Sequence, residues 1–292
     1  MAAQLIFAAL CSGALYALVA LGLNLVYGTL RLLNIAHGDL AMVGAYVAFV
    51  AMSALNVPPP VSMVLAAGLC ALMGWVLYAG IFKRLLASPE TAQRLEANSL
   101  ILFYGVSVIL QNVVALGFSA TSKGYQYLGE VHRIGPVAAS GNRLPLLAVA
   151  LAVSLGILLL LRLHAFGWSL RAVIERREAA GIVGVNVDRV QGITIMLGFA
   201  IAGVAGVLVS MTEQITPFMG FPLTIAAFVV IVLGGLGNVF AGVLAGFVLG
   251  FVETFGIALT SATYRSILIY GLFVAVLLVR PQGLFGKAIQ VR

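Results

Sequence analysis

The sequence contains very little charge. Only 9% of its 292 residues are Asp, Glu, Lys or Arg, whereas 62% are hydrophobic. Ordinary soluble domains carry about 25% charged residues, so this chain has too few polar side chains to cover a surface that faces water. The composition therefore excludes a soluble globular protein and predicts an integral membrane protein.

The residues that commonly build catalytic and metal sites are also scarce. The chain has two cysteines, Cys11 and Cys70, and both lie in apolar segments, where a small, soft side chain packs well. None of its three histidines belongs to a His-Glu-x-x-His motif, and no Gly-x-x-x-x-Gly-Lys loop is present to hold a nucleotide phosphate. We therefore predict no catalytic residues, no metal, no disulfide and no cofactor in this chain. ATP hydrolysis would have to take place in a partner protein.

Several uncharged apolar runs are long enough to cross a bilayer, whose hydrocarbon core of about 30 Å needs about 20 helical residues. These runs are continuous, unlike the alternating segments of membrane β-barrels, and helices satisfy their own backbone groups in lipid. We predict an all-α bundle in one domain, 1–292, with about 8 to 10 spans. The runs are 4–30, 40–82, 97–122, 144–161, 190–212 and 214–252, and Pro58-Pro59-Pro60 divides the second into two spans.

Basic residues cluster in three segments, which contain eleven of the sixteen lysines and arginines. By the positive-inside rule these segments are cytoplasmic, which places 123–143 and 216–220 outside. The same clustering relates the net charge of +7 to a membrane rather than to nucleic acid. No basic residue precedes the first apolar run, so we expect a retained first helix instead of a cleaved signal peptide. The clusters are Lys83, Arg84 and Arg94; Arg162, Arg171, Arg176, Arg177 and Arg189; and Arg280, Lys287 and Arg292.

Two glycine-rich segments interrupt the apolar pattern, at 28–44 and at 234–246. Paired interruptions of this kind in the two halves of a chain are typical of repeat-built transporters with a binding site at the membrane midplane. We therefore hypothesise an inverted repeat with broken or re-entrant segments. The region 221–263 contains either two spans or one re-entrant excursion followed by a span, and the sequence leaves both alternatives open.

Polar residues and glycines in and near these interruptions are candidates for a translocation pathway, because burying polar groups in lipid is costly. A half-helix N-terminus near Gly38 would offer N–H groups to a substrate carboxylate. Simpler interpretations stay open: Asp39 caps a helix over 40–49, the asparagines bond to neighbouring helices, and the glycines allow close packing. Glu253 and Arg265 could pair at the external boundary. The pathway candidates are Asn24, Asn34, His37, Asp39, Gly234, Gly235, Gly237 and Asn238.

The longest internal loop, 164–190, has the pattern of a short amphipathic helix at the membrane surface. Ser169 is its candidate N-cap, 170–182 contains mostly good helix formers, and Gly184 with Asn186 provides a stop. One interpretation is a helix that rests on anionic headgroups. The other is a docking element: the small residues of the loop enter a partner's groove, Glu178 pairs with a basic group there, and Gly184 turns the chain away.

The loop carries Glu178-Ala179-Ala180 followed by Gly184, which resembles the Glu-Ala-Ala loop of bacterial ATP-binding cassette import permeases, whose short helix docks on a cytoplasmic ATPase. Four further segments resemble the branched-chain amino-acid permease family, in particular its H-type subunit, and the resemblance covers nearly the whole chain. These segments are 21–28 (Leu-Gly-Leu-Asn-Leu-Val-Tyr-Gly), 33–39 (Leu-Asn-Ile-Ala-His-Gly-Asp), 232–238 (Val-Leu-Gly-Gly-Leu-Gly-Asn) and 280–286 (Arg-Pro-Gln-Gly-Leu-Phe-Gly).

The resemblance implies a permease subunit in a bacterial inner membrane, working with a second, different permease chain, two cytoplasmic ATPases that hold ATP and Mg²⁺, and a periplasmic binding protein. The implied substrate is a branched-chain amino acid or a related small polar or carboxylate solute. The rival function is an ion-coupled secondary transporter, in which His37, Asp39 and Glu253 relay protons. The residues that the resemblance assigns to coupling with the ATPase are Glu178, Ala179, Ala180, Gly184, Arg171 and Arg177.

Overall fold

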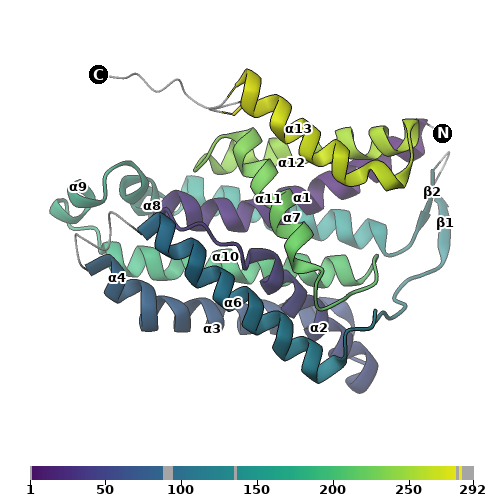
Figure 1. The fold of residues 1–292 in the computed structure, drawn as a ribbon, viewed down its shortest axis with the longest axis horizontal. Coiled ribbons are helices and arrows are strands. Elements are labelled where there is room, and N and C mark those ends of the chain that lie inside the picture. The colour runs from purple at the N-terminus through teal and green to yellow at the C-terminus, as the bar shows by residue number, and fades with distance from the viewer. Residues whose placement is uncertain (1, 88–94, 135–136, 281–282, 285–292) are drawn as a thin grey trace.

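The computed structural model describes residues 2–87, 95–134, 137–280 and 283–284. It is a bundle of long helices, with a short antiparallel hairpin of strands β1 (Val131–Ile134) and β2 (Val137–Ser140) at one end (Figure 1). In the hairpin His132 pairs with Ala139. Arg94, Lys287 and Arg292 of the predicted basic clusters, and 281–282 and 285–286 of the last family-like segment, lie outside the described residues.

The helices follow the predicted apolar runs. α3 (Pro59–Leu77) continues through a π-helical turn, η1 (Tyr78–Phe82), into α4 (Lys83–Ala87), and a 3-10 turn, η2 (Ala262–Tyr264), precedes α13 (Arg265–Val279). The internal loop carries α8 (Ala165–Glu175) and α9 (Arg177–Ile182). The other helices are α1 (Ala2–Leu30), α2 (His37–Leu55), α3 (Pro59–Leu77), α6 (Leu95–Phe118), α7 (Arg143–Leu163), α10 (Val187–Ser210), α11 (Gly220–Gly234), α12 (Val239–Leu259) and α13 (Arg265–Val279).

Eight of the helical stretches that the structure describes are long and apolar enough to cross a membrane. α11 is shorter: its 15 residues extend only about 22 Å at about 1.5 Å per residue, less than a hydrocarbon core of about 30 Å. The region 221–263 therefore holds one short helix followed by one span, which is the second of the two alternatives. The prediction of an all-α polytopic bundle with about 8 to 10 spans is confirmed.

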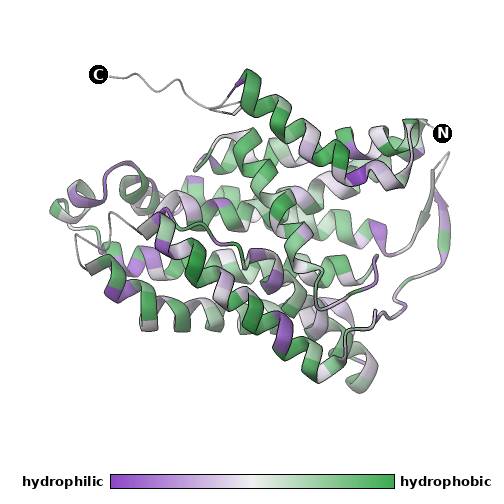
Figure 2. Cartoon of the chain, in the orientation of Figure 1, coloured by the Kyte–Doolittle hydropathy of each residue, from purple (hydrophilic) through white to green (hydrophobic). Residues whose placement is uncertain are grey.

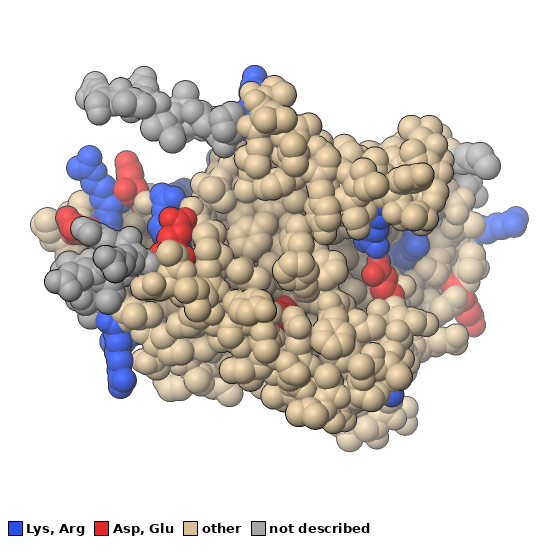
Figure 3. Space-filling view, viewed as in Figure 1, with Lys and Arg blue, Asp and Glu red and all other residues tan. Residues whose placement is uncertain are grey.

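The two ends of the bundle carry most of its polar residues. Figure 2 shows mainly hydrophobic residues along the helices, and Figure 3 shows charged side chains gathered toward the two ends with an almost uncharged band between them. We call the end with α4, α8 and α9 the basic end, and the opposite end, with β1 and β2, the hairpin end. Such a surface suits a protein whose middle is surrounded by lipid, where charged side chains are costly.

α1 and α10 form the centre of the bundle. Both are almost wholly apolar on every face, which is typical of buried helices. Their backbones approach closely at Gly22 and Gly198, where a Cβ on either glycine would lie 2.7 Å from the other's carbonyl oxygen. α1 also packs on α11 and α12, whereas α10 packs on α2 and α3. Each central helix therefore packs on the two helices that follow the other central helix in the chain.

These contacts arrange α1–α3 and α10–α12 as an inverted repeat. α1 runs to the basic end, the chain folds back over 31–36, and α2 begins inside the bundle and continues toward the hairpin end. α10 runs the opposite way, the chain folds back over 211–219, and α11 begins inside the bundle and ends near the basic end. The hypothesised pairing of 28–44 with 234–246 is therefore wrong. The counterpart of the break at 31–36 is 211–219, because 235–238 is only the turn between α11 and α12.

Candidate functional site

The internal loop forms two helices instead of the single helix predicted over 170–182. α8 begins at Ala165, because the ring of His164 accepts a backbone hydrogen bond and caps the helix there. Ser169 lies inside α8, where its hydroxyl donates to the carbonyl oxygen of Ala165, so the prediction that Ser169 is the N-cap is wrong. The helix breaks at Arg176, whose backbone is extended with φ −152° and ψ 104°. The short helix α9 follows.

α9 presents the Glu-Ala-Ala motif at the basic end (Figure 1). Glu178 and Ala179 are exposed, whereas Ala180 is buried. Just beyond the motif, Ile182 and Val183 are 87% and 76% exposed. An apolar tip with an acidic neighbour therefore projects from the basic end, as a docking element requires.

The chain leaves α9 through Gly184, whose φ of 87° lies in the left-handed region that glycine adopts at little cost. The prediction of a sharp turn at Gly184 is confirmed. Asn186 belongs to the next element, because its side chain accepts a hydrogen bond from Arg189 N–H at 2.9 Å and caps α10. It does not help to stop the loop helix, as the sequence had suggested.

α8 rests on the end of α1. Leu170 and Val173 are buried, and the side chain of Ile174 lies 3.7 Å from the position that a Cβ on Gly28 would take. Arg171, on another face of α8, is exposed. A displacement of α8 would therefore press directly on the last turn of α1.

Polar contacts join the two sides of the loop to α4 and its neighbour η1. Arg177 donates to the carbonyl oxygen of Leu86 at 3.5 Å. At the start of α10, Asp188 accepts from Tyr78 and forms an ion pair with Lys83, each at 2.8 Å. The loop is thus connected to three helical elements, α1, α4 and α10, whose ends meet at the basic end.

The turn between α11 and α12 is bound to α1 by Asn24. The side chain of Asn24 donates to the carbonyl oxygen of Asn238 and accepts from Gly237 N–H, both at 2.9 Å. Gly235 and Gly237 have φ of 95° and 83°, and a Cβ on Gly234 would lie 2.7 Å from a backbone nitrogen of α12. Four of the predicted pathway residues therefore lie in or beside one tight turn near the basic end, and a fifth, Asn24, binds this turn to α1. These bonds match the simpler interpretation of helix-to-helix contacts, and contact with substrate stays a prediction.

The remaining pathway candidates lie at the break between α1 and α2. His37 bonds through Nε2 to the carbonyl oxygen of Val19 at 3.0 Å. α2 begins at His37, so Asp39 sits within its first turn, and the prediction of Asp39 as an N-cap is wrong. Its Oδ1 instead accepts from Nε2 of Gln111 on α6 at 3.0 Å.

The starts of α2 and α11 meet at this break. Gly38 N–H donates to Oγ1 of Thr224 at 2.8 Å, and the same hydroxyl donates to the carbonyl oxygen of Ile35. A Cβ on Gly38 would overlap the carbonyl oxygen of Gly220, so the first turns of α2 and α11 touch through their backbones. Two helix N-termini, each with a positive dipole end, therefore point into one buried region.

Several polar atoms in this region have no hydrogen-bond partner within the part of the chain that the structure describes. Both polar atoms of the Asn34 side chain, Nδ1 of His37 and Oδ2 of Asp39 are all buried. Unpaired buried polar groups are costly, which makes this break the best candidate for a polar path within the bundle. Sequence reasoning missed Gln111 and Thr224, although each is a polar group within an apolar run and so carried a signal.

Glu253 and Arg265 form the ion pair that the sequence suggested. Arg265 also donates to the hydroxyl of Tyr16 at 3.1 Å. Glu253 is only 4% exposed, so this cluster fastens the start of α13 to α12 and α1.

These features define a class: a polytopic helical membrane protein with two re-entrant breaks at its centre and an exposed loop helix at one end. The model of the family described as branched-chain amino acid transport system / permease component matches residues 5–277. The chain belongs to this permease family.

Individual relatives agree with the family match. The chain is 32% identical to the high-affinity branched-chain amino acid transport system permease protein BraD of Pseudomonas aeruginosa, over 94% of this chain and 92% of that protein. It is 31% identical to LivH of Escherichia coli K12, over 97% and 95%. The probable permease LivH of Methanocaldococcus jannaschii is 26% identical, over 93% and 89%. No solved structure matches the chain.

Proposed function

We propose that this chain is the membrane-spanning permease subunit of an ATP-binding cassette importer in the bacterial inner membrane. In this assembly it pairs with a second, related permease chain, two cytoplasmic ATPases that hydrolyse Mg-ATP, and a periplasmic binding protein. The observation that carries the proposal is the exposed tip of α9, which projects beside the joined ends of α1, α4 and α10.

The coupling step follows from these contacts. When the ATPases close on ATP, they move α9 and α8 as a unit, with the exposed Glu178 and Ala179 seated in an ATPase groove and the buried Ala180 anchoring α9 to the bundle. Ile174 transmits the movement to α1 through Gly28, and Arg177 transmits it to α4 through Leu86. Nucleotide binding thereby shifts the population of the permease between its two access states.

The proposed substrate is a branched-chain amino acid or a related small carboxylate. Two lines of support meet here: the relatives are branched-chain amino acid transport permeases by name, and the break holds two helix N-termini with unpaired buried polar groups. Positive dipole ends favour a carboxylate. The polar groups at the break would let a hydrated substrate pass through an otherwise apolar bundle.

Reconstitution tests this proposal directly. The chain is placed in vesicles with its cognate permease, ATPases and binding protein, and uptake of labelled leucine is measured with ATP or with a proton gradient alone. We expect uptake only with ATP. Uptake driven by the gradient alone, without ATPases, would establish the ion-coupled transporter instead.

A further inference from the structure

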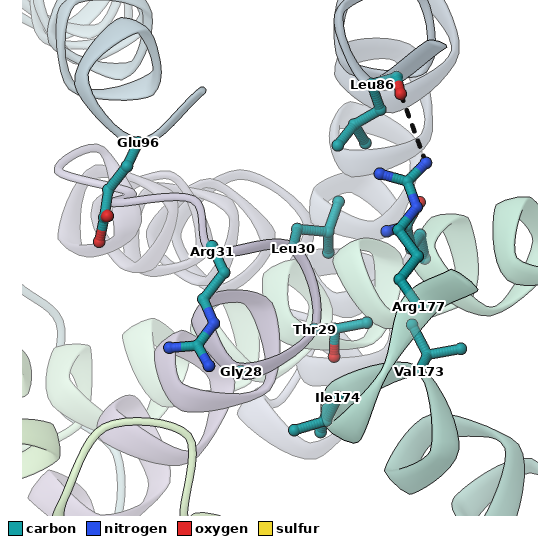
Figure 4. Close-up of a pocket in the computed structure, with 10 residues that line it drawn as sticks. Gly28, Thr29, Leu30, Arg31, Leu86, Glu96, Val173, Ile174 and Arg177 are labelled. Atoms are coloured by element: carbon teal, nitrogen blue, oxygen red, sulfur yellow. Dashed lines mark hydrogen bonds between the residues drawn. The ribbon is translucent and has the colours of Figure 1, made fainter. Parts of the chain in front are cut away.

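A cavity of about 400 Å³ lies at the basic end, between the end of α1, α4, the start of α6 and α8 (Figure 4). Its size falls within the range of about 300–1,000 Å³ typical of small-molecule sites. Three charged residues line it: Arg31, Glu96 and Arg177. Within the part of the chain that the structure describes, none of the three forms an ion pair.

The charged groups of this cavity are held in place by local contacts. The hydroxyl of Tyr27 donates to Oε1 of Glu96 at 3.0 Å, and the Tyr27 ring lies 5.7 Å from the guanidinium carbon of Arg31, within cation–π range. Arg177 lies apart from Arg31 and is fixed by its bond to Leu86 (Figure 4). The cavity therefore offers one carboxylate and two guanidinium groups at separate positions.

The rest of the lining is largely aliphatic. Leu30, Leu86, Val173 and Ile174 supply apolar surface, and Thr29 and Gln191 supply further polar groups. A matching ligand carries a carboxylate for a guanidinium group, which is a strong charge-assisted pairing. It also carries an ammonium group for Glu96 and an aliphatic side chain for the apolar wall.

We propose that this cavity binds an aliphatic amino acid from the cytoplasm, and that the bound amino acid slows transport when the product accumulates. Val173 and Ile174 of α8 form one wall, while α1, α4 and α6 form the others. A ligand that bridges these walls holds the internal loop, 164–190, against the bundle and opposes its movement. This inference rests on the proposed function, which places the basic end in the cytoplasm, and adds a product site to it.

Binding is tested on the assembled permease–ATPase complex without its binding protein, so that the binding protein's own leucine site is absent, and the Glu96 and Arg31 variants separate this cavity from the polar break. Leucine is compared with 4-methylpentanoate, which lacks the ammonium group, and with 3-methylbutylamine, which lacks the carboxylate. We expect leucine to bind at least about tenfold more tightly than either analogue, because each analogue loses one charge-assisted contact. Glu96→Gln keeps an acceptor for Tyr27 but removes the charge, and should abolish the preference for leucine over 4-methylpentanoate.

A second variant, Arg31→Gln, tests the carboxylate contact and should weaken the preference for leucine over 3-methylbutylamine. The matched controls are Glu130→Gln and Arg133→Gln, which alter exposed charges at the hairpin end and should bind as the unaltered protein does. If leucine does not bind, or if Glu96→Gln and Arg31→Gln retain both preferences, the proposal is wrong. Tighter binding of glycerophosphoethanolamine than of leucine would also overturn it and identify a lipid-headgroup site.

Transport gives the second readout. In vesicles preloaded with leucine, ATP-driven uptake by the unaltered importer should fall severalfold as the internal leucine rises. The Glu96→Gln importer should keep its rate, and both should be equal when internal leucine is absent. Equal inhibition of the two importers would refute the product site while leaving ATP-driven import intact, whereas loss of ATP dependence in the unaltered importer would refute the proposed function itself.

Discussion

The contact between the starts of α2 and α11 makes Gly38→Ala an informative substitution. A Cβ at Gly38 would overlap the carbonyl oxygen of Gly220 and lie 2.6 Å from Oγ1 of Thr224, whereas non-bonded carbon atoms pack best at about 3.5–4.0 Å. The overlapping oxygen belongs to the backbone of α11, so no side-chain rotation relieves the overlap. The first turns of α2 and α11 must move apart.

The cost can be worked out from these contacts. Overpacking in a well-packed interior costs about 1–3 kcal/mol, and the bond from Gly38 N–H to Thr224, now 2.8 Å long, contributes about 0.5–1.5 kcal/mol if it is lost. A total on the order of 3 kcal/mol would lower the apparent melting temperature by roughly 10 °C, at about 2–4 °C per kcal/mol for chains of this size. Uptake should fall as well, because the displaced turns frame the polar break.

The assay is fluorescence-monitored unfolding of the purified protein in detergent, together with uptake in vesicles. The matched controls are Gly68→Ala and Gly105→Ala, where a Cβ would meet nothing within 4 Å, and both should behave as the unaltered protein does. If Gly38→Ala unfolds and transports as these controls do, the direct contact between α2 and α11 is not present in the protein.

Three further substitutions test other parts of the chain. Gly184→Ala places a side chain at φ 87°, at a cost of about 1–2 kcal/mol, and should leave the protein inserted but remove substrate-stimulated ATP turnover; normal turnover would contradict the coupling role. Asn24→Ala breaks two bonds to the 235–238 turn and should lower the melting temperature by a few degrees, since such bonds contribute about 0.6 kcal/mol each; an unchanged melting temperature would argue against this tether. Arg265→Gln leaves the buried Glu253 carboxylate without its charge partner and should destabilise the protein in the same unfolding assay. Adding Glu253→Gln should restore part of the lost stability. No recovery in the double variant would show that loss of the ion pair is not the cause of the destabilisation.

The membrane spans were predictable because they depend on local composition. An uncharged run such as 97–122 can satisfy its backbone in lipid only as a helix, and α6 indeed begins at Leu95 and ends at Phe118. The helix ends at Pro58-Pro59-Pro60 and at Gly184 were equally predictable, since proline restricts the backbone locally and glycine frees it. Both places end or redirect helices in the structure.

The errors arose where a residue's partner is distant in the sequence or where two caps compete. Asp39 resembled an N-cap, but its partner is Gln111 on α6, and no local pattern relates two residues so far apart. Ser169 resembled a cap as well, yet His164 starts α8 earlier with its own ring nitrogen. The repeat was paired on glycine content, although the glycines of 234–246 serve a turn and close helix packing. The counterpart of the first break, 211–219, contains no glycine and is only followed by one, Gly220.

Three of the four family-like segments lie near one another in space, although more than two hundred residues separate the first from the last. Asn24 of 21–28 binds the turn in 232–238, and Leu284 N–H of 280–286 donates to Leu233 at 2.7 Å. This cluster adjoins Gly28, where α8 rests on α1. The segment 33–39 is different, because it forms the break inside the bundle and touches α11 there.

α11 therefore joins the two places: one of its ends meets the polar break at Gly38, and its other end meets the turn beside the internal loop. In the proposed importer, a displacement of α8 reaches α11 through Gly28 and Asn24, and it alters the break without any long-range rearrangement of side chains. For this reason α11, the shortest helix of the repeat, is the element best placed to couple nucleotide binding to the change between the two access states.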